Sequence, residues 1–198
     1  MKLLLATQNK NKVIELKRLL KDYPQYEVNS LSDMNLQDDI EETGLTFEDN
    51  ARLKALHIYR LTGIACIADD SGLEIEALNN EPGVYSARYL GENTAYTIKN
   101  QVILDRMKDS TNRSARFVSV VCLVLNEDEI YSFEGIMPGS IGFEAKGDNG
   151  FGYDPIFVPK GYNLSYAEME LDVKNKLSHR GQALRKAVDF LEKGYYEK

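Results

Sequence analysis

Two adjacent aspartates, Asp69 and Asp70, follow a short apolar run and stand directly before Ser71 and Gly72. The apolar run, residues 64–68, predicts a short buried strand, and the two carboxylates are expected where the chain turns at the end of that strand. Neighbouring strand residues point to opposite faces, so both side chains are not expected to enter the core. Adjacent like charges need a cation or hydrogen-bond donors nearby, which predicts either a solvated turn or a site for a metal and acid–base chemistry.

A second candidate site lies near the beginning of the sequence. Residues 2–6 predict a buried strand, residues 7–9 a polar turn, and residues 10–21 an amphipathic helix. A helix start directs free backbone N–H groups and a positive dipole end at an anion, and Lys10 and Lys12 add full charges there. The segment predicts either phosphate binding or an ordinary N-cap with solvated lysines, and it is not a P-loop because the required glycines are absent.

A glycine-rich loop carries aromatic side chains that the sequence predicts to be exposed. Residues 147–155 contain three glycines besides Phe151 and Tyr153. Aromatic rings on a flexible loop make poor core material, and the flat face of a planar ligand is a natural partner for them. The alternative is the tip of a hydrophobic hairpin.

Hydrogen-bond donors gather again at the predicted start of the last helix, where Ser178, His179 and Arg180 are consecutive. Such donors can bind a carbonyl or a phosphate. A Ser-His-Asp triad is the alternative reading of His179, and the sequence argues against it because no Gly-x-Ser-x-Gly turn is present.

The segments that must position these residues alternate between strands and helices. Thr46 and Asp49 resemble a capping box for a helix that ends at Gly63. The remaining elements expected between this helix and the last one are a strand over 73–78, a helix capped at 93 or 94 that ends near 109, a hairpin of strands over 116–125 and 130–136, and a further short strand starting at 137.

Composition limits both the class of protein and the kind of metal site. The 198 residues are 43% hydrophobic, which suits one domain with a real core. No apolar run is long enough to cross a membrane, so a soluble, cytoplasmic protein is expected. The net charge of −7 argues against a nucleic-acid binder. Two Cys and two His nearly exclude a thiolate or imidazole metal site, so any metal is expected to be Mg²⁺ or Mn²⁺ held by oxygen, and both cysteines are expected buried and reduced.

Six short segments, in this order and spacing, make the chain resemble the inosine triphosphate pyrophosphatase family along nearly its whole length. They are 6–12 (ATQNKNK), 42–47 (ETGLTF), 68–73 (ADDSGL), 82–89 (PGVYSARY), 151–157 (FGYDPIF) and 178–184 (SHRGQAL). The resemblance implies a single domain over residues 1–198, an α/β fold in which a long, twisted mixed β-sheet is flanked by helices. It further implies two lobes sharing that sheet, a nucleotide cleft between the lobes, and a homodimer. The implied reaction is Mg²⁺-dependent hydrolysis of ITP, dITP and XTP to the monophosphate and pyrophosphate.

The resemblance also assigns roles to residues of this chain. Asp70 is the implied metal ligand and the base that activates water, with Glu41 or Glu42 and Asp69 as candidates to complete the metal shell in an ambiguous acidic loop that includes Asp38 and Asp39. Contacts to the triphosphate and the nucleotide are implied for Thr7, Gln8, Asn9, Lys10, Asn11, Lys12, Lys54 and Ser71. Recognition of the base is implied for Phe151, Gly152, Tyr153, Asp154, Lys174, His179 and Arg180.

Two rival functions are consistent with parts of this pattern. One is a pyrophosphatase of the Maf kind, which acts on pyrimidine or modified nucleotides, and the segment 178–180 argues against it. The other is a nucleotide-binding sensor without catalysis, to which the paired carboxylates would bring little. Pyrophosphate release from ITP with and without Mg²⁺ separates the three possibilities.

Overall fold

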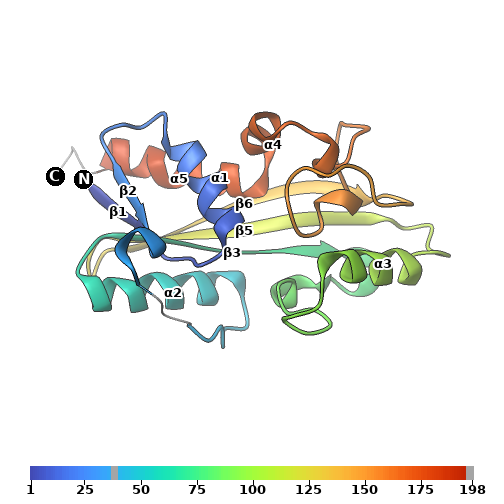
Figure 1. Cartoon of the computed structure of the whole chain (residues 1–198), viewed down its shortest axis with the longest axis horizontal. Helices are drawn as coiled ribbons and strands as arrows, with labels where there is room; N and C mark the ends of the chain where they lie inside the picture. Colours follow the sequence, from blue (N-terminus) through green and yellow to red (C-terminus); the bar gives the residue numbers. More distant parts are fainter. Residues whose placement is uncertain (37–39, 195–198) are drawn as a thin grey trace. The chain divides into compact units, whose positions relative to one another are not determined.

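Within residues 1–36 and 40–194, the part of the chain that the computed structural model describes, one seven-stranded mixed sheet is flanked by five α-helices (Figure 1). The strand order is β2-β1-β3-β5-β6-β7, and β4 pairs with β3. The strands are β1 Lys2–Leu5, β2 Glu27–Ser30, β3 Cys66–Ile75, β4 Glu81–Pro82, β5 Ser114–Val124, β6 Ile130–Ile141 and β7 Phe157–Pro159. The α-helices are α1 Lys10–Leu20, α2 Phe47–Thr62, α3 Tyr96–Arg106, α4 Leu171–Leu177 and α5 His179–Gly194.

The sheet is mixed because β1 runs parallel to both of its neighbours whereas later strands are antiparallel. Leu3 pairs with Val28 of β2, and Leu5 pairs with Ile67 of β3, both in parallel register. The pairs β3–β4 and β6–β7 are antiparallel. This α/β architecture confirms the expected fold class of a mixed sheet flanked by helices.

The chain divides into two compact units. Each of the strands β3, β5 and β6 has residues in both units. Unit 1 comprises Met1–Asp70, Ser119–Gly135 and Arg180–Lys198, and unit 2 comprises Ser71–Val118 and Ile136–His179.

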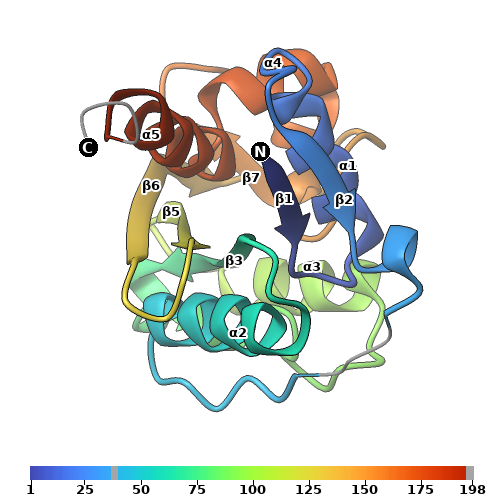
Figure 2. The ribbon, with the colours of Figure 1, turned by 90° about the vertical axis from the view of Figure 1, so that its left-hand side faces the viewer.

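Unit 1 has helices on both faces of its strands. Leu3 and Leu5 of β1 belong to an apolar cluster with residues of α1 and α5, and Leu4 points to the opposite face. Helix α2 covers that opposite face (Figure 2). A strand covered on both faces is expected to be apolar at successive positions, and after the exposed Lys2 the residues of β1 are three consecutive buried leucines.

The two helices of unit 1 that the sequence predicted most clearly have well-formed caps. The Asn9 side chain accepts hydrogen bonds from the backbone N–H groups of the second and third residues of α1. Thr46 caps α2 in the same way through the N–H of Asp49, and Gly63 ends it with a positive φ of 66°. Capping and apolar periodicity agree in both helices, so the predicted boundaries are confirmed to within a residue.

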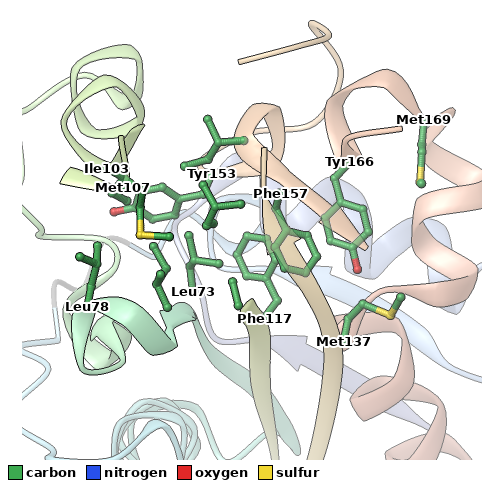
Figure 3. Packing of buried hydrophobic residues seen from close by; sticks show 14 residues of the cluster. Leu73, Leu78, Ile103, Met107, Phe117, Met137, Tyr153, Phe157, Tyr166 and Met169 are labelled. Atoms are coloured by element: carbon green, nitrogen blue, oxygen red, sulfur yellow. The ribbon is translucent and has the colours of Figure 1, made fainter. Parts of the chain in front are cut away.

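The core of unit 2 is rich in aromatic residues (Figure 3). The rings of Phe117 and Phe157 meet edge to face at 4.7 Å, and Tyr166 stacks on Phe117 at 5.8 Å. Tyr153 lies in the same cluster beside Ile103 of α3, as Figure 3 shows. The glycine-rich loop therefore sends one of its aromatic rings into the core.

Four details of the predicted elements are wrong. The chain does not turn after Asp70, because β3 continues without interruption to Ile75. The separate strand expected from residue 137 is the end of β6, where Pro138 lies beside the end of β7 and its carbonyl accepts from the Lys160 N–H at 2.9 Å. Helix α3 starts after Ala95 rather than after 93 or 94, and the short helix α4 was not predicted.

Both cysteines are buried and free, as expected. Burial raises the pKa of the Cys66 thiol to about 12 and that of Cys122 to about 11. Among the described residues no helix is long and apolar enough to cross a membrane.

Candidate functional site

The two adjacent aspartates of β3 are both buried, and they contact different helices. Asp69 meets side chains of α1 and α5, whereas Asp70 meets side chains of α2. The expectation that both could not enter the core is wrong, because unit 1 has a helix layer on each face of the strand. One Asp-Asp pair thus supplies one carboxylate to each face.

On one face, Asp69 accepts from two cations, and we call this group, together with Glu15, the Asp69 cluster. The Lys12 Nζ lies 3.1 Å and the Arg180 Nε 3.0 Å from the same carboxylate oxygen, Oδ2. Arg180 also donates to Glu15 of α1 through Nη1. Asp69 is fully buried, and Arg180 and Glu15 are each 3% exposed. The cluster ties α5 and α1 to β3 and holds the Lys12 ammonium in a fixed place.

The charges of the Asp69 cluster keep its carboxylate ionised. Burial alone would raise the pKa of Asp69, but the positive charges of Lys12 and Arg180 outweigh burial and hold that pKa well below its usual range. Burial is also the main reason why the pKa of Lys12 is lowered, although Asp69 opposes this shift. Asp69 is therefore a permanent anion that positions a lysine.

The predicted phosphate-binding turn lies where Lys12 enters this cluster. Asn9 accepts from the N–H groups of Asn11 at 3.0 Å and Lys12 at 3.2 Å, and the Thr7 hydroxyl accepts from the Asn9 N–H at 3.2 Å. Gln8, Lys10 and Asn11 are exposed. The turn is thus held in one conformation by its own side chains, next to a fixed lysine.

On the other face, Asp70 is held by two donors from α2, and we call this group, with Glu42, the Asp70 cluster. Asn50 Nδ2 donates to Oδ2 of Asp70 at 3.2 Å, and the Lys54 Nζ lies 3.3 Å from Oδ1. The same Nζ is 2.6 Å from Glu42 Oε1. Asn50 is itself fixed, because its Oδ1 accepts from the Gly44 N–H at 2.8 Å.

The Asp70 carboxyl differs from its neighbour in how readily it binds a proton. Burial raises its pKa, and the opposing charges of Lys54 and Lys12 are too weak to reverse that shift. Burial would lower the pKa of Lys54, but Asp70 and Glu42 outweigh it and raise the pKa. Two neighbouring carboxyls whose pKa values are moved in opposite directions are typical of a divided role, one carboxyl structural and one accepting protons.

The carboxylates that could hold a metal are fewer than the sequence suggested. Within residues 1–36 and 40–194, no three Asp, Glu, His or Cys side chains are grouped closely enough to form a metal site alone. Glu41 is exposed, Glu42 is half-buried against Lys54, and Asp69 faces the other side of the strand from Asp70. The predicted Asp38 and Asp39 lie outside the described residues. Mg²⁺ commonly takes only one or two carboxylates and completes its shell with substrate phosphates and water, so Asp70 with Glu42 fits its needs.

Unit 2 has its own cluster of predicted binding residues, arranged around Asp154. The Lys174 Nζ is 2.6 Å from Asp154 Oδ2, which also accepts from the Phe151 N–H at 2.8 Å. The same ammonium lies 5.2 Å from the centre of the Phe151 ring. Gly150, at φ 71°, has no room for a side chain, since an added Cβ would lie 2.1 Å from Asp154 Oδ2. One buried ion pair therefore shapes residues 150–154. We call them the base loop, after the nucleobase recognition that the resemblance implies for residues 151–154.

Two of the predicted base-binding aromatic and imidazole groups are buried in unit 2. The expected exposure of Tyr153 is wrong: it is 3% exposed, and its hydroxyl donates to the Ser86 carbonyl at 2.8 Å. His179 is also buried, with its ring stacked on Phe117 at 4.6 Å. Phe151 remains partly exposed and is the ring of the loop that is accessible to a ligand.

A family assignment follows from comparison with known proteins. The model of the Ham1 family matches residues 3–190. The chain belongs to the Ham1 family. The match spans both units and all six of the short segments that suggested the resemblance, so the expected resemblance is confirmed.

Proteins similar to this Ham1-family chain match it along nearly their whole length. A dITP/XTP pyrophosphatase from Flavobacterium psychrophilum is 43% identical over 192 residues, covering 97% of this chain and 100% of that protein. One from Christiangramia forsetii is 46% identical over 193 residues, covering 98% of this chain and 100% of that protein. The solved structure of a HAM1 protein from Coxiella burnetii is 40% identical, with a TM-score of 0.88 over 98% of this chain and 100% of that one. The solved structure of the Staphylococcus aureus Ham1 protein is 38% identical, with a TM-score of 0.87 over 100% of both chains.

Three polar residues of this Ham1-family site were not found from the sequence. Asn50 stands four positions before Lys54 on the same face of α2, and this spacing could have indicated a shared partner. Glu15 interrupts the apolar side of α1, where a carboxylate needs a buried cation. Ser86, which receives the Tyr153 hydroxyl bond, had no signal of its own in the sequence.

Proposed function

We propose that this chain hydrolyses non-standard purine nucleoside triphosphates, namely ITP, dITP and XTP, to the monophosphate and pyrophosphate. The assignment to the Ham1 family and the names of the full-length relatives support this reaction. The observation that carries it is the division of labour between Asp69 and Asp70, one fixing a cation and the other able to accept a proton. The reaction is a nucleoside triphosphate pyrophosphohydrolysis, the work of an enzyme that removes damaged nucleotides from the pool.

We assign the triphosphate to unit 1, at the start of α1. Lys12, held by Asp69, would neutralise phosphate charge, and the turn formed by Thr7 and Asn9 would donate hydrogen bonds to phosphate oxygens, with Gln8, Lys10 and Asn11 around it. A preorganised cation is worth more to a phosphate than a mobile one, because no side-chain entropy is lost on binding.

Asp70 is the residue to which we assign removal of a proton from the attacking water. Burial raises the pKa of Asp70, whereas the pKa of Asp69 is lowered, so Asp70 is the better proton acceptor of the two carboxylates. Asn50 and Lys54 each donate to one of its oxygens and so fix the direction of the remaining lone pairs. The water would attack the α-phosphorus in line with the departing pyrophosphate.

Mg²⁺, with Mn²⁺ as an alternative, is the cofactor that this donor set fits. Asp70 and Glu42 would hold it, with Glu41 as an alternative ligand, while the placement of Asp69 on the other face counts against it as a third. When bound, the metal would neutralise charge on the phosphates and lower the pKa of water.

We assign the purine to unit 2, and within it to the base loop together with Lys174 and His179. Phe151 offers a ring for stacking, and Lys174, whose ammonium lies beside that ring, offers a donor to a 6-keto oxygen. Adenine carries an amino group at that position, and an unpaired buried donor costs about 1–3 kcal/mol. Arg180 was predicted to take part, but its pairing with Asp69 and Glu15 supports a structural task instead.

The test is a panel of nucleotides. Purified protein with Mg²⁺ should release pyrophosphate from ITP, dITP and XTP much faster than from ATP or GTP, and chelation should stop release. Comparable rates on all five nucleotides would refute the preference for non-standard purines. Binding of ITP without any pyrophosphate release would make the protein a sensor rather than an enzyme. Preference for a pyrimidine triphosphate would favour a Maf-like activity.

The proposal also covers the oligomeric state of the protein and its location in the cell. The substrates are products of damage to the cytoplasmic nucleotide pool, so we place the enzyme in the cytoplasm, acting on a free nucleotide rather than on nucleic acid or at a membrane. We also expect a homodimer, which light scattering of the purified protein would verify.

A further inference from the structure

Helix α3 presents two consecutive buried polar side chains that no predicted role explains. Lys99 is 1% exposed and Asn100 is 5% exposed, whereas the flanking residues Ile98 and Gln101 are exposed. Lysine in particular is almost never fully buried unless it is paired. Both side chains point into unit 2.

Lys99 is paired with a backbone carbonyl instead of a carboxylate. Its Nζ donates to the Ala87 carbonyl at 2.6 Å and lies 4.8 Å from the centre of the Tyr96 ring, and no carboxylate among the described residues pairs with it. Burying an ammonium without a counter-charge costs free energy. A methionine of similar shape would not carry this cost, and what the ammonium provides in this structure is the bond to the Ala87 carbonyl, at the end of residues 83–87.

Asn100 makes a corresponding bond to the base loop. Its Nδ2 donates to the Gly152 carbonyl at 3.1 Å, and its Oδ1 is buried with no partner among the described residues. Leaving a buried acceptor unpaired costs free energy. The amide therefore costs stability that an apolar residue would avoid, while it holds the loop by its Gly152 carbonyl.

The two loops held by α3 are also joined directly to each other. Tyr153 of the base loop donates its hydroxyl to the Ser86 carbonyl, one residue before the carbonyl that Lys99 binds. Its ring packs edge to face on Tyr96 at 5.2 Å, and Figure 3 shows it pointing into the core. Ser86 Oγ in turn accepts from the Leu73 N–H at 2.9 Å, on the strand that carries the two aspartates.

We propose that Lys99 and Asn100 are positioning residues that set purine selectivity, by holding the base loop and residues 83–87 in the arrangement that accepts a 6-keto purine. Neither side chain touches the nucleotide. The inference rests on the proposed function and deepens it, because it makes selectivity a property of α3 as well as of the donors that contact the base.

The test compares neighbouring substitutions on one helix. Asn100→Leu removes the amide donor, and Gln101→Leu makes the same change at an exposed position whose side chain bonds only within α3. We expect Asn100→Leu to lower the ratio of kcat/KM for ITP over ATP about tenfold or more, through KM, with kcat on ITP changed less than about threefold. Gln101→Leu should leave the ratio unchanged. An unchanged ratio in a folded Asn100→Leu would overturn the proposal.

Substitutions of Lys99 provide a second, independent test, which includes one substitution expected to restore the selectivity. Lys99→Met should reduce the same ratio, and Lys99→Arg, which keeps a donor, should restore most of it. Equal ratios in the Met and wild-type proteins would contradict the role of Lys99 even if the melting temperature falls.

Hydrogen exchange of the wild-type protein completes the test without any variant. Amides of residues 150–154 should exchange slowly before nucleotide is added. Rapid exchange that slows only with ITP would show that the ligand, and not α3, orders the loop. Failure of the wild type to prefer ITP would instead refute the proposed function.

Discussion

The Asp69 cluster makes a quantitative prediction about stability. Asp69→Asn keeps the shape of the side chain but removes the buried carboxylate that pairs with both Lys12 and Arg180. Removing one partner of a buried ion pair costs about 3–5 kcal/mol. For a chain of this length, each kcal/mol lowers the melting temperature by roughly 2–4 °C. We therefore expect Asp69→Asn to melt roughly 6–20 °C below the wild type at pH 7.

The same substitution has a defined pH dependence. The folded-state pKa of Asp69 is lowered, so its contribution to stability is complete above the ordinary carboxyl pKa of about 3.9 and is lost as the pH falls through the folded-state value. Urea unfolding of both proteins should give a constant difference between pH 5 and pH 8 that shrinks below about pH 4. Glu127→Gln, which removes an exposed carboxylate paired with the exposed Arg60, is the control and should leave the midpoint nearly unchanged at pH 7. A difference below about 1 kcal/mol for Asp69→Asn at pH 7 would refute the reasoning, since exposed ion pairs already reach that value.

Three further predictions concern single sites. Lys54→Met should lower kcat on ITP about ten- to a hundred-fold, because a charge-assisted hydrogen bond is worth about 1.5–3 kcal/mol, and an unaltered kcat in steady-state assays would contradict its role. Gly150→Ala should raise KM for ITP, because its Cβ would displace Asp154, while ATP turnover changes little; equal effects on both nucleotides would argue against a base-specific loop. Cys66 and Cys122 should resist a thiol reagent at pH 8 until urea unfolds the chain, and fast labelling of the native protein would show that they are not buried.

The helices that could be placed from the sequence are those with a capping side chain and a regular apolar face. Asn9 and Thr46 cap helices whose apolar faces repeat regularly, so α1 and α2 could be placed to within a residue. Helix α4 is short, has no side-chain cap, and exposes Val173, so neither capping nor periodicity marks it. Its position depends on the buried contact of Lys174 with Asp154, which lies 20 residues away.

The length of β3, the strand that carries the candidate site, depends on side chains from other elements of the fold. Two aspartates normally end a buried strand, yet β3 continues because Lys12 and Arg180 compensate Asp69 while Asn50 and Lys54 compensate Asp70. Lys12 and Arg180 lie 57 and 111 residues from Asp69 in the sequence. Asn50 and Lys54 lie 20 and 16 residues before Asp70, so rules that act over a few residues could not reveal any of these partners. The resemblance predicted Asp70, Lys12 and Lys54 as site residues, and Asp69, Glu42 and Arg180 in other roles, but it did not predict Asn50 or Glu15.

The fate of the oxygen atom from water tests the central claim most directly. Hydrolysis of ITP in ¹⁸O-water with Mg²⁺, followed by mass spectrometry of the products, identifies which phosphorus is attacked. We predict one ¹⁸O in the nucleoside monophosphate, unlabelled pyrophosphate as the other product, and loss of both products in a folded Asp70→Asn protein. Labelled orthophosphate together with the nucleoside diphosphate, or undiminished turnover by Asp70→Asn, would contradict the account.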